Sequence, residues 1–153
     1  MLEAGSQPPP IDLPAGDGGR VRLDDFAGRP VVVYFYPKDD TSGCTREAQD
    51  FTALLEDFRA AGAAVVGISP DGPKSHAKFA AKYDLAFPLA SDENKEVCAA
   101  YGVWVEKSMY GRKYMGVERS TFLIGRDGRI ARVWRKVKVP GHAAEVLEAA
   151  RQT

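Results

Sequence analysis

The chain has 153 residues, of which 44% are hydrophobic and 27% charged, and this composition is typical of a soluble globular protein with one sizeable core. Its 21 basic and 21 acidic side chains give a net charge of zero, and the basic residues are scattered, so nothing favours nucleic acid or an anionic membrane as a partner. Two cysteines are too few for a disulfide-stapled secreted scaffold, and no segment resembles a signal peptide or a membrane span, so we expect a cytoplasmic protein.

The opening segment, residues 1–19, is rich in proline and glycine and predicts an extended, surface-wrapping lead-in that ends in a turn at Gly16–Gly19. A short edge strand is expected next, at Val21–Leu23. The run Val31–Tyr36 is continuously β-branched or aromatic, which is typical of a central strand buried on both faces.

An amphipathic helix is predicted over Cys44–Arg59, because apolar residues recur there at helical spacing. Gly62 ends this helix, and Ala63–Ser69 supplies a second apolar strand, so that strand, helix and strand form a right-handed βαβ unit. Further helices are expected over Pro73–Tyr83 and Asn94–Tyr101.

The C-terminal part predicts a β-hairpin and a last helix. Two apolar runs, Ser120–Ile124 and Arg129–Trp134, flank the Asp-Gly pair of Gly125–Gly128, which is a strong hairpin pattern. An Ala-rich helix follows over His142–Arg151. Upstream, the cationic, aromatic and Met residues of Lys107–Met115 are interpreted as a loop, which either contacts substrate or a reductase or is simply solvated.

This order of elements predicts an α/β protein with a thioredoxin-like fold, in which helices flank a central mixed sheet. A flavodoxin-like open sheet would need more βα repeats than the C-terminal half supplies. We expect one domain over residues 1–153, with residues 1–19 as its lead-in.

The clearest chemical pattern lies between Tyr36 and Glu47. This segment begins where a buried strand ends and stops in the first turn of a helix, at the sheet edge where α/β folds bind ligands. The helix dipole there favours the thiolate of Cys44, which is the nucleophilic form. Most free cysteines are small buried hydrophobes, but the small, mostly polar neighbours of Cys44 suit a hydrogen-bonding pocket better than a core. We therefore interpret Cys44 as reactive.

The spacing of Pro37, Thr41 and Cys44 matches the peroxiredoxin signature Pro-x-x-x-Thr/Ser-x-x-Cys. The wider run from Phe35 to Glu47 resembles the Q-type branch of that superfamily, also called bacterioferritin comigratory proteins. The resemblance extends over most of the chain and includes Leu23–Gly28, Ala100–Trp104, Tyr110–Arg112 and Arg119–Ile124.

The resemblance implies a peroxidase that reduces hydrogen peroxide and organic hydroperoxides with thiols and needs no metal, haem or flavin. It implies that Cys44 is the peroxidatic nucleophile, that Thr41 hydrogen-bonds the peroxide, and that Pro37 covers the sulfur. Arg119 would bond the peroxide oxygens and stabilise the thiolate, while Glu47 would hold Arg119. From the residues alone, Arg119 and Glu47 would instead be solvated surface charges.

Attack on a peroxide converts Cys44 to a sulfenic acid, which must condense with a second thiol before it is reduced. Q-type relatives often carry that thiol five residues later or on the next helix, but those positions hold Gln49 and Ala80 here. Cys98 is the only internal candidate, and its place beside Val97 on an amphipathic helix favours burial. We therefore expect a one-cysteine mechanism with glutathione, a glutaredoxin or thioredoxin as reductant. The alternative is a Cys44–Cys98 disulfide, which would require local unfolding around Cys44.

Two other functions stay open at this point. A thiol-disulfide reductase on the same fold is disfavoured because Cys-x-x-Cys is absent, and a non-enzymatic holdase is disfavoured because the peroxiredoxin signature is intact. No metal site is predicted, since His76 and His142 are far apart in sequence and neither is beside a cysteine. The resemblance to Q-type proteins, which are often monomers although some pair through the edge near the active site, leads us to expect a monomer, with a dimer as the alternative.

Overall fold

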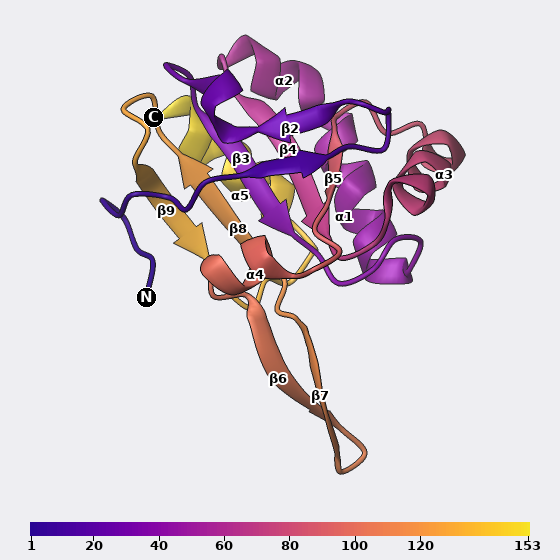
Figure 1. Cartoon of the computed structure of the whole chain (residues 1–153). Coiled ribbons are helices and arrows are strands. Elements are labelled where there is room, and N and C mark those ends of the chain that lie inside the picture. Colours follow the sequence, from indigo (N-terminus) through magenta and orange to yellow (C-terminus); the bar gives the residue numbers. More distant parts are fainter.

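The centre of the molecule is a five-stranded mixed sheet in the order β5–β4–β3–β8–β9, as seen in a computed structural model that describes residues 1–153 (Figure 1). The strands are β5 (Leu89–Ser91), β4 (Ala64–Ser69), β3 (Val31–Phe35), β8 (Ser120–Ile124) and β9 (Ile130–Trp134). The middle strand, β3, runs parallel to β4 and antiparallel to β8. The predicted central mixed sheet is therefore confirmed, although β5 was not anticipated.

The middle strand separates two hydrophobic cores, one on each face of the sheet. Successive side chains of a strand point to opposite faces. Accordingly Val31, Val33 and Phe35 pack in one core, whereas Val32 and Tyr34 pack in the other. All five side chains of β3 are buried, which explains its unbroken apolar sequence.

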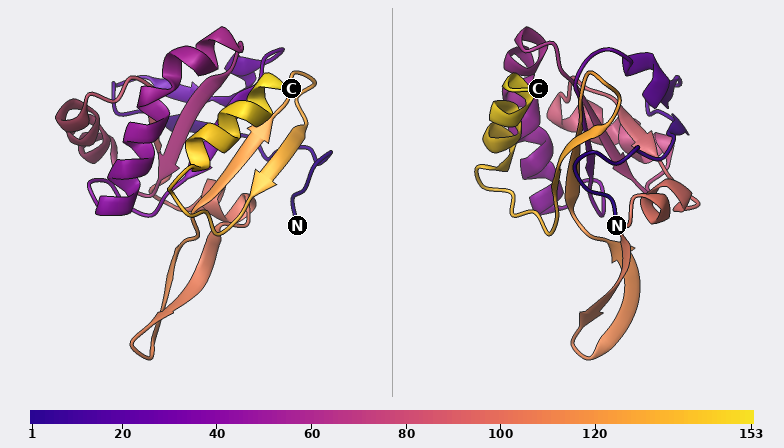
Figure 2. Two further views of the ribbon diagram at one scale, coloured as in Figure 1. Left: turned by 180° about the vertical axis from the view of Figure 1, so that it is seen from behind. Right: turned by 90° about the vertical axis from the view of Figure 1, so that its left-hand side faces the viewer.

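Four helices cover the face of the sheet that carries Tyr34 (Figure 2). They are α1 (Ser42–Ala53), α2 (Leu55–Ala60), α3 (Pro73–Tyr83) and α5 (His142–Arg151). The bounds of α3 and α5 agree with those predicted from the sequence. None of the helices combines the length and hydropathy needed to cross a membrane.

The single helix predicted over Cys44–Arg59 is wrong in one respect, because it is broken at Leu54. That residue leaves helical backbone at φ −101° and ψ 5°, and its N–H bonds the carbonyl of Phe51, three residues back. Leu55 and Phe58, beyond the break, are buried in the same core as Phe51. Periodicity alone conceals the break, since apolar residues continue through it.

The lead-in crosses the second face of the sheet and pairs with both edges. The N–H of Ile130 in β9 donates to the carbonyl of Ser6, and Ala15 forms a bridge with Ala90 in β5. Ile11, Leu13 and Ala15 bury their side chains in the second core. The lead-in therefore covers a sheet face on which no long helix lies.

The lead-in also contains a strand that the sequence did not indicate. It is β1 (Asp12–Pro14), which pairs antiparallel with β2 (Arg20–Arg22) across the predicted turn. The expected edge strand is thus shifted by one residue, because Leu23 already begins the short 3-10 helix η1 (Leu23–Phe26). It belongs to a separate two-stranded sheet, not to the edge of the main one.

A short helix, α4 (Glu96–Ala100), lies on the same face as the lead-in. It is shorter than the predicted span, because Lys95 has a positive φ of 62° and cannot begin the helix earlier. The buried carboxylate of Asp92 accepts the N–H groups of Val97 and Cys98, which otherwise lack partners in the first turn.

A two-stranded hairpin projects from the body of the molecule and is called the arm here (Figures 1 and 2). It consists of β6 (Trp104–Met109) and β7 (Arg112–Val117), joined by Tyr110 and Gly111 with φ values of 52° and 78°. Positive φ at both turn residues is typical of a tight two-residue hairpin turn. The loop predicted over Lys107–Met115 is therefore wrong.

Candidate active site

Cys44 lies in the first turn of α1, where the sequence placed it, although the helix begins two residues earlier, at Ser42. The chain leaves the buried strand β3 at Phe35 and enters α1 through Thr41, whose carbonyl accepts the N–H of Thr45. The Cys44 side chain is only 2% exposed. Its sulfur therefore lies at the N-terminus of the helix, near the first N–H groups of α1, with little access to bulk water.

Arg119 reaches Cys44 from the other half of the chain. Its Nη2 atom donates a hydrogen bond to the Cys44 sulfur at 3.3 Å. The next residue, Ser120, begins β8 and is paired with Phe35 at the end of β3. The antiparallel register thus brings Arg119 to the point where β3 gives way to the loop before α1.

Glu47 holds the other end of the same guanidinium. Arg119 Nη1 donates to Glu47 Oε1 at 2.6 Å, and Glu47 is only 1% exposed. Burial raises the pKa of Glu47 to about 7, although the charge of Arg119 acts in the opposite direction. The interpretation of Arg119 and Glu47 as solvated surface charges is therefore wrong.

Thr41 and Pro37 lie in the loop that leads from β3 into α1. Thr41 Oγ1 donates its hydrogen to the carbonyl of Lys38 at 2.9 Å. With its proton engaged, this hydroxyl presents only lone pairs to a bound molecule, whereas Arg119 presents only N–H donors. Pro37 is half-buried and follows the fully buried Tyr36. Thr41 thus offers an acceptor, whereas Arg119 offers a fork of donors.

The loop between β3 and α1 is anchored by a buried polar cluster that the sequence did not reveal. Asp39 Oδ1 accepts from Tyr36 Oη at 2.5 Å, while Oδ2 accepts from Ser75 Oγ at 2.7 Å and contacts His76 Nδ1 at 2.8 Å. The N–H of Asp39 donates to Asp71 at 2.8 Å. These bonds join the loop to α3 and fix the backbone that carries Thr41.

His142 begins α5 beside the site. Its Nε2 atom lies 2.7 Å from Thr121 Oγ1. The segment just before α5 also contacts the site, because the backbone N–H of Val137 donates to the carbonyl of Arg119. Burial lowers the pKa of His142 to about 4, and Arg119 and Arg132 reinforce this effect. No group of three or more His, Cys, Asp or Glu side chains that could hold a metal ion occurs in the structure.

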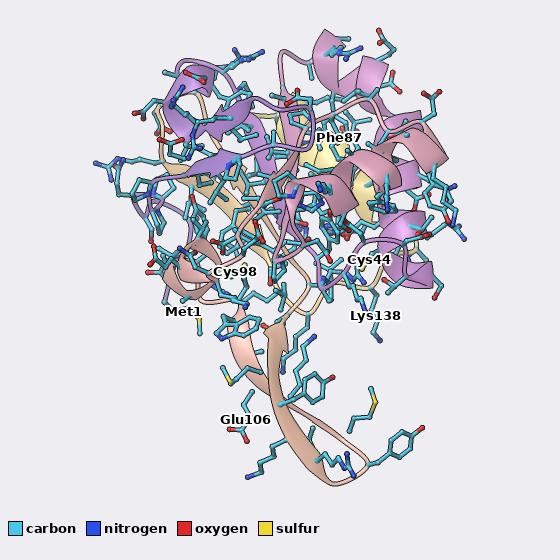
Figure 3. The ribbon with its side chains drawn as sticks, turned by 45° about the vertical axis from the view of Figure 1, so that its right-hand side comes forward. Met1, Cys44, Phe87, Cys98, Glu106 and Lys138 are labelled. Carbon is cyan, nitrogen blue, oxygen red and sulfur yellow. The ribbon has the colours of Figure 1, made fainter.

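Cys98 lies far from this site in the architecture. It is buried in the core on the opposite face of the sheet from Cys44, and Figure 3 labels both residues. Burial raises the pKa of the Cys98 thiol, and contact with Asp92 raises it further. The expected burial of Cys98 is therefore confirmed, and its thiol is held in the protonated, unreactive form.

Comparison with known proteins gives one consistent result. Residues 4–133 match the sequence model of the AhpC/TSA family. The chain is 50% identical over 141 residues to peroxiredoxin Bcp of Xanthomonas campestris, covering 91% of this chain and 88% of that protein. It is 45% identical over 147 residues to peroxiredoxin Bcp of Bacillus subtilis, covering 96% of this chain and 94% of that protein.

Solved structures agree with the sequence relatives. A cysteine-to-serine mutant of PrxQ from Xylella fastidiosa superposes with a TM-score of 0.94 at 41% identity, covering 99% of this chain and 97% of that chain. Xanthomonas campestris peroxiredoxin Q superposes with a TM-score of 0.89 at 48% identity, covering 93% and 90%. The Xanthomonas protein was solved as two different cysteine-to-serine mutants, and another of its structures concerns alkyl peroxide reduction.

Proposed function

We propose that Cys44 is the peroxidatic cysteine of this chain, which belongs to the AhpC/TSA family. The chain has the thioredoxin-like fold and the thiol-dependent peroxidase activity of the Bcp and peroxiredoxin Q proteins. The observation that carries this assignment is the hydrogen bond of Arg119 Nη2 to the Cys44 sulfur at 3.3 Å. Membership of this family favours a peroxidase over the two alternatives, a thiol-disulfide reductase and a non-enzymatic holdase.

The reaction transfers one oxygen atom to the sulfur. The Cys44 thiolate forms a bond to one peroxide oxygen while the O–O bond breaks, and the bonding electron pair goes to the other oxygen. That oxygen takes up a proton and leaves as water or an alcohol. Cys44 is oxidised to a sulfenic acid and the peroxide is reduced.

Each neighbouring residue has a distinct proposed part in this step. Negative charge moves from the sulfur to the departing oxygen, so donors already fixed in place stabilise the transition state more than the ground state. Arg119 supplies those donors and Glu47 keeps its guanidinium oriented. Thr41 accepts the hydrogen bond of the peroxide O–H, because its own proton is engaged by Lys38. Pro37 limits the access of water to the sulfur.

Hydroperoxides are the oxidising substrates, and thiols are the reductants, as in the family. We propose that both hydrogen peroxide and organic hydroperoxides are used, which the work on alkyl peroxide reduction by the Xanthomonas relative supports. We further propose a monomer with a single domain over residues 1–153, located in the cytoplasm.

The sulfenic acid is resolved, we propose, by an external thiol, with glutathione, a glutaredoxin or thioredoxin as candidates. Cys98 is unsuited, because the sheet separates the core that holds it from the core that holds Cys44. Ala80 on α3 stands at the same separation from Cys44 as lies between the two cysteines mutated in the Xanthomonas structures. This chain therefore lacks a thiol where that relative carries its second cysteine.

Two cysteine variants test the proposal. Cys44→Ser should abolish peroxide consumption in the presence of dithiothreitol, whereas Cys98→Ser, the matched control, should retain it. Intact-mass analysis after one equivalent of peroxide should show a gain of oxygen on Cys44. Loss of two hydrogens would instead reveal a Cys44–Cys98 disulfide, and consumption that persists in Cys44→Ser would refute the assignment.

A further inference from the structure

The arm extends well beyond the body of the molecule and carries apolar side chains into solvent. Each strand has six residues, so at about 3.4 Å per residue the tip lies about 17 Å from the base. Tyr110 at the tip is 98% exposed, and Met109 and Met115 are 56% and 50% exposed. An isolated two-stranded hairpin is marginally stable in water, and Met and aromatic side chains are enriched at protein interfaces. These features are typical of a contact surface.

The strand register divides the arm into two faces, because directly paired residues share a face. The inner face carries Val105, Lys107, Met109, Arg112, Tyr114 and Gly116, and the outer face carries Trp104, Glu106, Ser108, Lys113, Met115 and Val117. At the base of the outer face, Val117 is buried in the second core, and Lys95, which precedes α4, lies over the Trp104 ring at 5.8 Å. The outer face is therefore the one that turns toward the second core.

The inner face turns toward Cys44. Partial burial lowers the pKa of Lys107 and the charge of Arg119 lowers it further, while Glu118 and Cys44 act in the opposite direction. The Lys107 side chain lies back toward the base of the arm over Gly116, where an added Cβ would come within 3.3 Å of Lys107 Cδ. In Figure 3, Glu106 of the outer face points away from the side on which Cys44 and Lys138 lie.

Five cations without an ion-pair partner lie in the active-site loop, in the segment that bonds the backbone of Arg119, and along the inner face of the arm. Lys38 lies in the active-site loop, Lys136 and Lys138 flank the residue that bonds the backbone of Arg119, and the inner face adds two more cations. The ion pairs of the protein involve none of these three lysines, nor Lys107 or Arg112. The whole chain is neutral, so this positive region favours a partner with an acidic surface.

We propose that the inner face of the arm is the docking surface for a protein dithiol reductant whose own surface is acidic around an apolar patch. This inference rests on the proposed function, since it concerns how the oxidised Cys44 is reduced. A small thiol bound at the sulfur leaves an arm about 17 Å long uncontacted, whereas a folded protein is large enough to reach the sulfur and the arm together. The arm therefore selects the protein reductant among the candidate thiols.

The reduction takes two steps, a condensation of a thiol with the sulfenic acid and then a thiol–disulfide exchange. A thiolate of the docked protein forms an S–S bond with the Cys44 sulfur, and the sulfenic oxygen leaves as water after taking up a proton. The second thiol of the reductant, as its thiolate, then attacks the sulfur of its own partner cysteine and releases the Cys44 thiolate. The reductant is oxidised to a disulfide and Cys44 returns to its starting state.

Two matched double variants test the docking surface. Met109→Ser with Arg112→Ser alters the inner face, and Met115→Ser with Lys113→Ser makes the same chemical change on the outer face. Peroxide turnover is measured with thioredoxin, its reductase and NADPH, and separately with dithiothreitol. The inner variant should raise KM for thioredoxin by about tenfold or more, and the outer variant by less than about twofold. Turnover with dithiothreitol should be equal in all three proteins.

Four results would overturn the proposal or the assignment beneath it. Equal KM values for the two variants would show that the inner face is not the docking surface. Turnover of the parent protein with dithiothreitol but not with thioredoxin would exclude a protein dithiol of this class. A change in sedimentation confined to the inner variant would identify a second copy of the chain as the occupant. Failure with both reductants would contradict the peroxidase assignment itself.

Discussion

Arg119 joins Cys44 to Glu47, two residues that lie one turn apart on α1. One guanidinium nitrogen lies 3.3 Å from the Cys44 sulfur and another lies 2.6 Å from a Glu47 oxygen. The guanidinium is rigid and planar, so fixing one of its nitrogens on Glu47 also fixes the direction of the nitrogen that faces the sulfur. The carboxylate thereby controls the donor geometry at a site that it does not itself touch.

Replacing Arg119 by lysine should slow the oxidation of Cys44 by peroxide about 10²–10³-fold, the usual cost of losing one fixed donor to a transition state. Lysine keeps the positive charge, but one ammonium group cannot bond the sulfur and Glu47 in the same fork. Stopped-flow measurement of the reaction with hydrogen peroxide checks this expectation. As a control, Arg46→Lys changes an exposed arginine of the same helix and should leave the rate unaltered; a comparable loss there would contradict the assignment.

The oxidation rate should fall as the pH is lowered through about 7. Burial raises the pKa of Glu47 to about 7, so below this pH the carboxylate takes up a proton and Arg119 loses its anionic partner. Glu47→Gln keeps the shape without the charge and should lack this step in the pH profile. A step near pH 7 that persists in Glu47→Gln would assign the titration to another group.

The stability of the protein should change with pH in the opposite direction to the oxidation rate, also because of Glu47. Folded Glu47 binds a proton more tightly than it does in the unfolded chain, where its pKa is near 4.5. The free energy of unfolding should therefore decrease as pH rises from about 4.5 to about 7. Urea unfolding at several pH values should show that Glu47→Gln removes this part of the dependence.

His142 should make the protein sensitive to acid. Burial lowers its pKa to about 4 from an ordinary 6.5, so the unfolded chain binds a proton in this range while the folded protein does not. The contribution of His142 to stability is present above pH 6.5 and is lost as pH falls toward about 4. His142→Gln should flatten the melting temperature across that window, and an unchanged slope would contradict this expectation.

Gly67→Ala should destabilise the fold by about 1–3 kcal/mol, the usual cost of overpacking a core. Gly67 is paired with Tyr34, and an added Cβ would lie 2.9 Å from Tyr34 Cζ and 3.0 Å from Leu89 Cδ2. The hydroxyl of Tyr34 is buried without a hydrogen-bond partner, so Tyr34→Phe should cost no stability. Chemical denaturation of both variants tests the pair; a neutral Gly67→Ala would show that Tyr34 moves aside easily.

The elements best predicted from the sequence are those whose buried side chains recur at a regular spacing. The unbroken apolar run of β3 and the helical spacing of α3 and α5 each leave one dominant interpretation. The arm has no such pattern, because both of its faces are largely exposed along most of its length. Its turn places Tyr110 at positive φ, where glycine or asparagine is the usual indicator. A loop was therefore the natural but wrong interpretation.

The residues of the proposed active site also differ in how clearly the sequence indicates them. The neighbours of Cys44 were enough to interpret it as reactive, whereas Arg119 and Glu47 were indicated only by the family resemblance. They are separated by 72 residues, and only the antiparallel pairing of β3 with β8 brings them together. The anchor formed by Asp39 and His76 was missed for the same reason, since it depends on how α3 packs beside the loop.

The placement of the two cysteines on opposite sides of the sheet has a consequence for survival under oxidative stress. Under the proposed one-cysteine mechanism, the sulfenic acid of Cys44 persists until a reductant arrives, and during that interval a further peroxide molecule can carry it to the irreversible sulfinic acid. The lifetime of the enzyme is then set by the ratio of peroxide to reductant around it, and inactivation should begin when the supply of electrons falls behind.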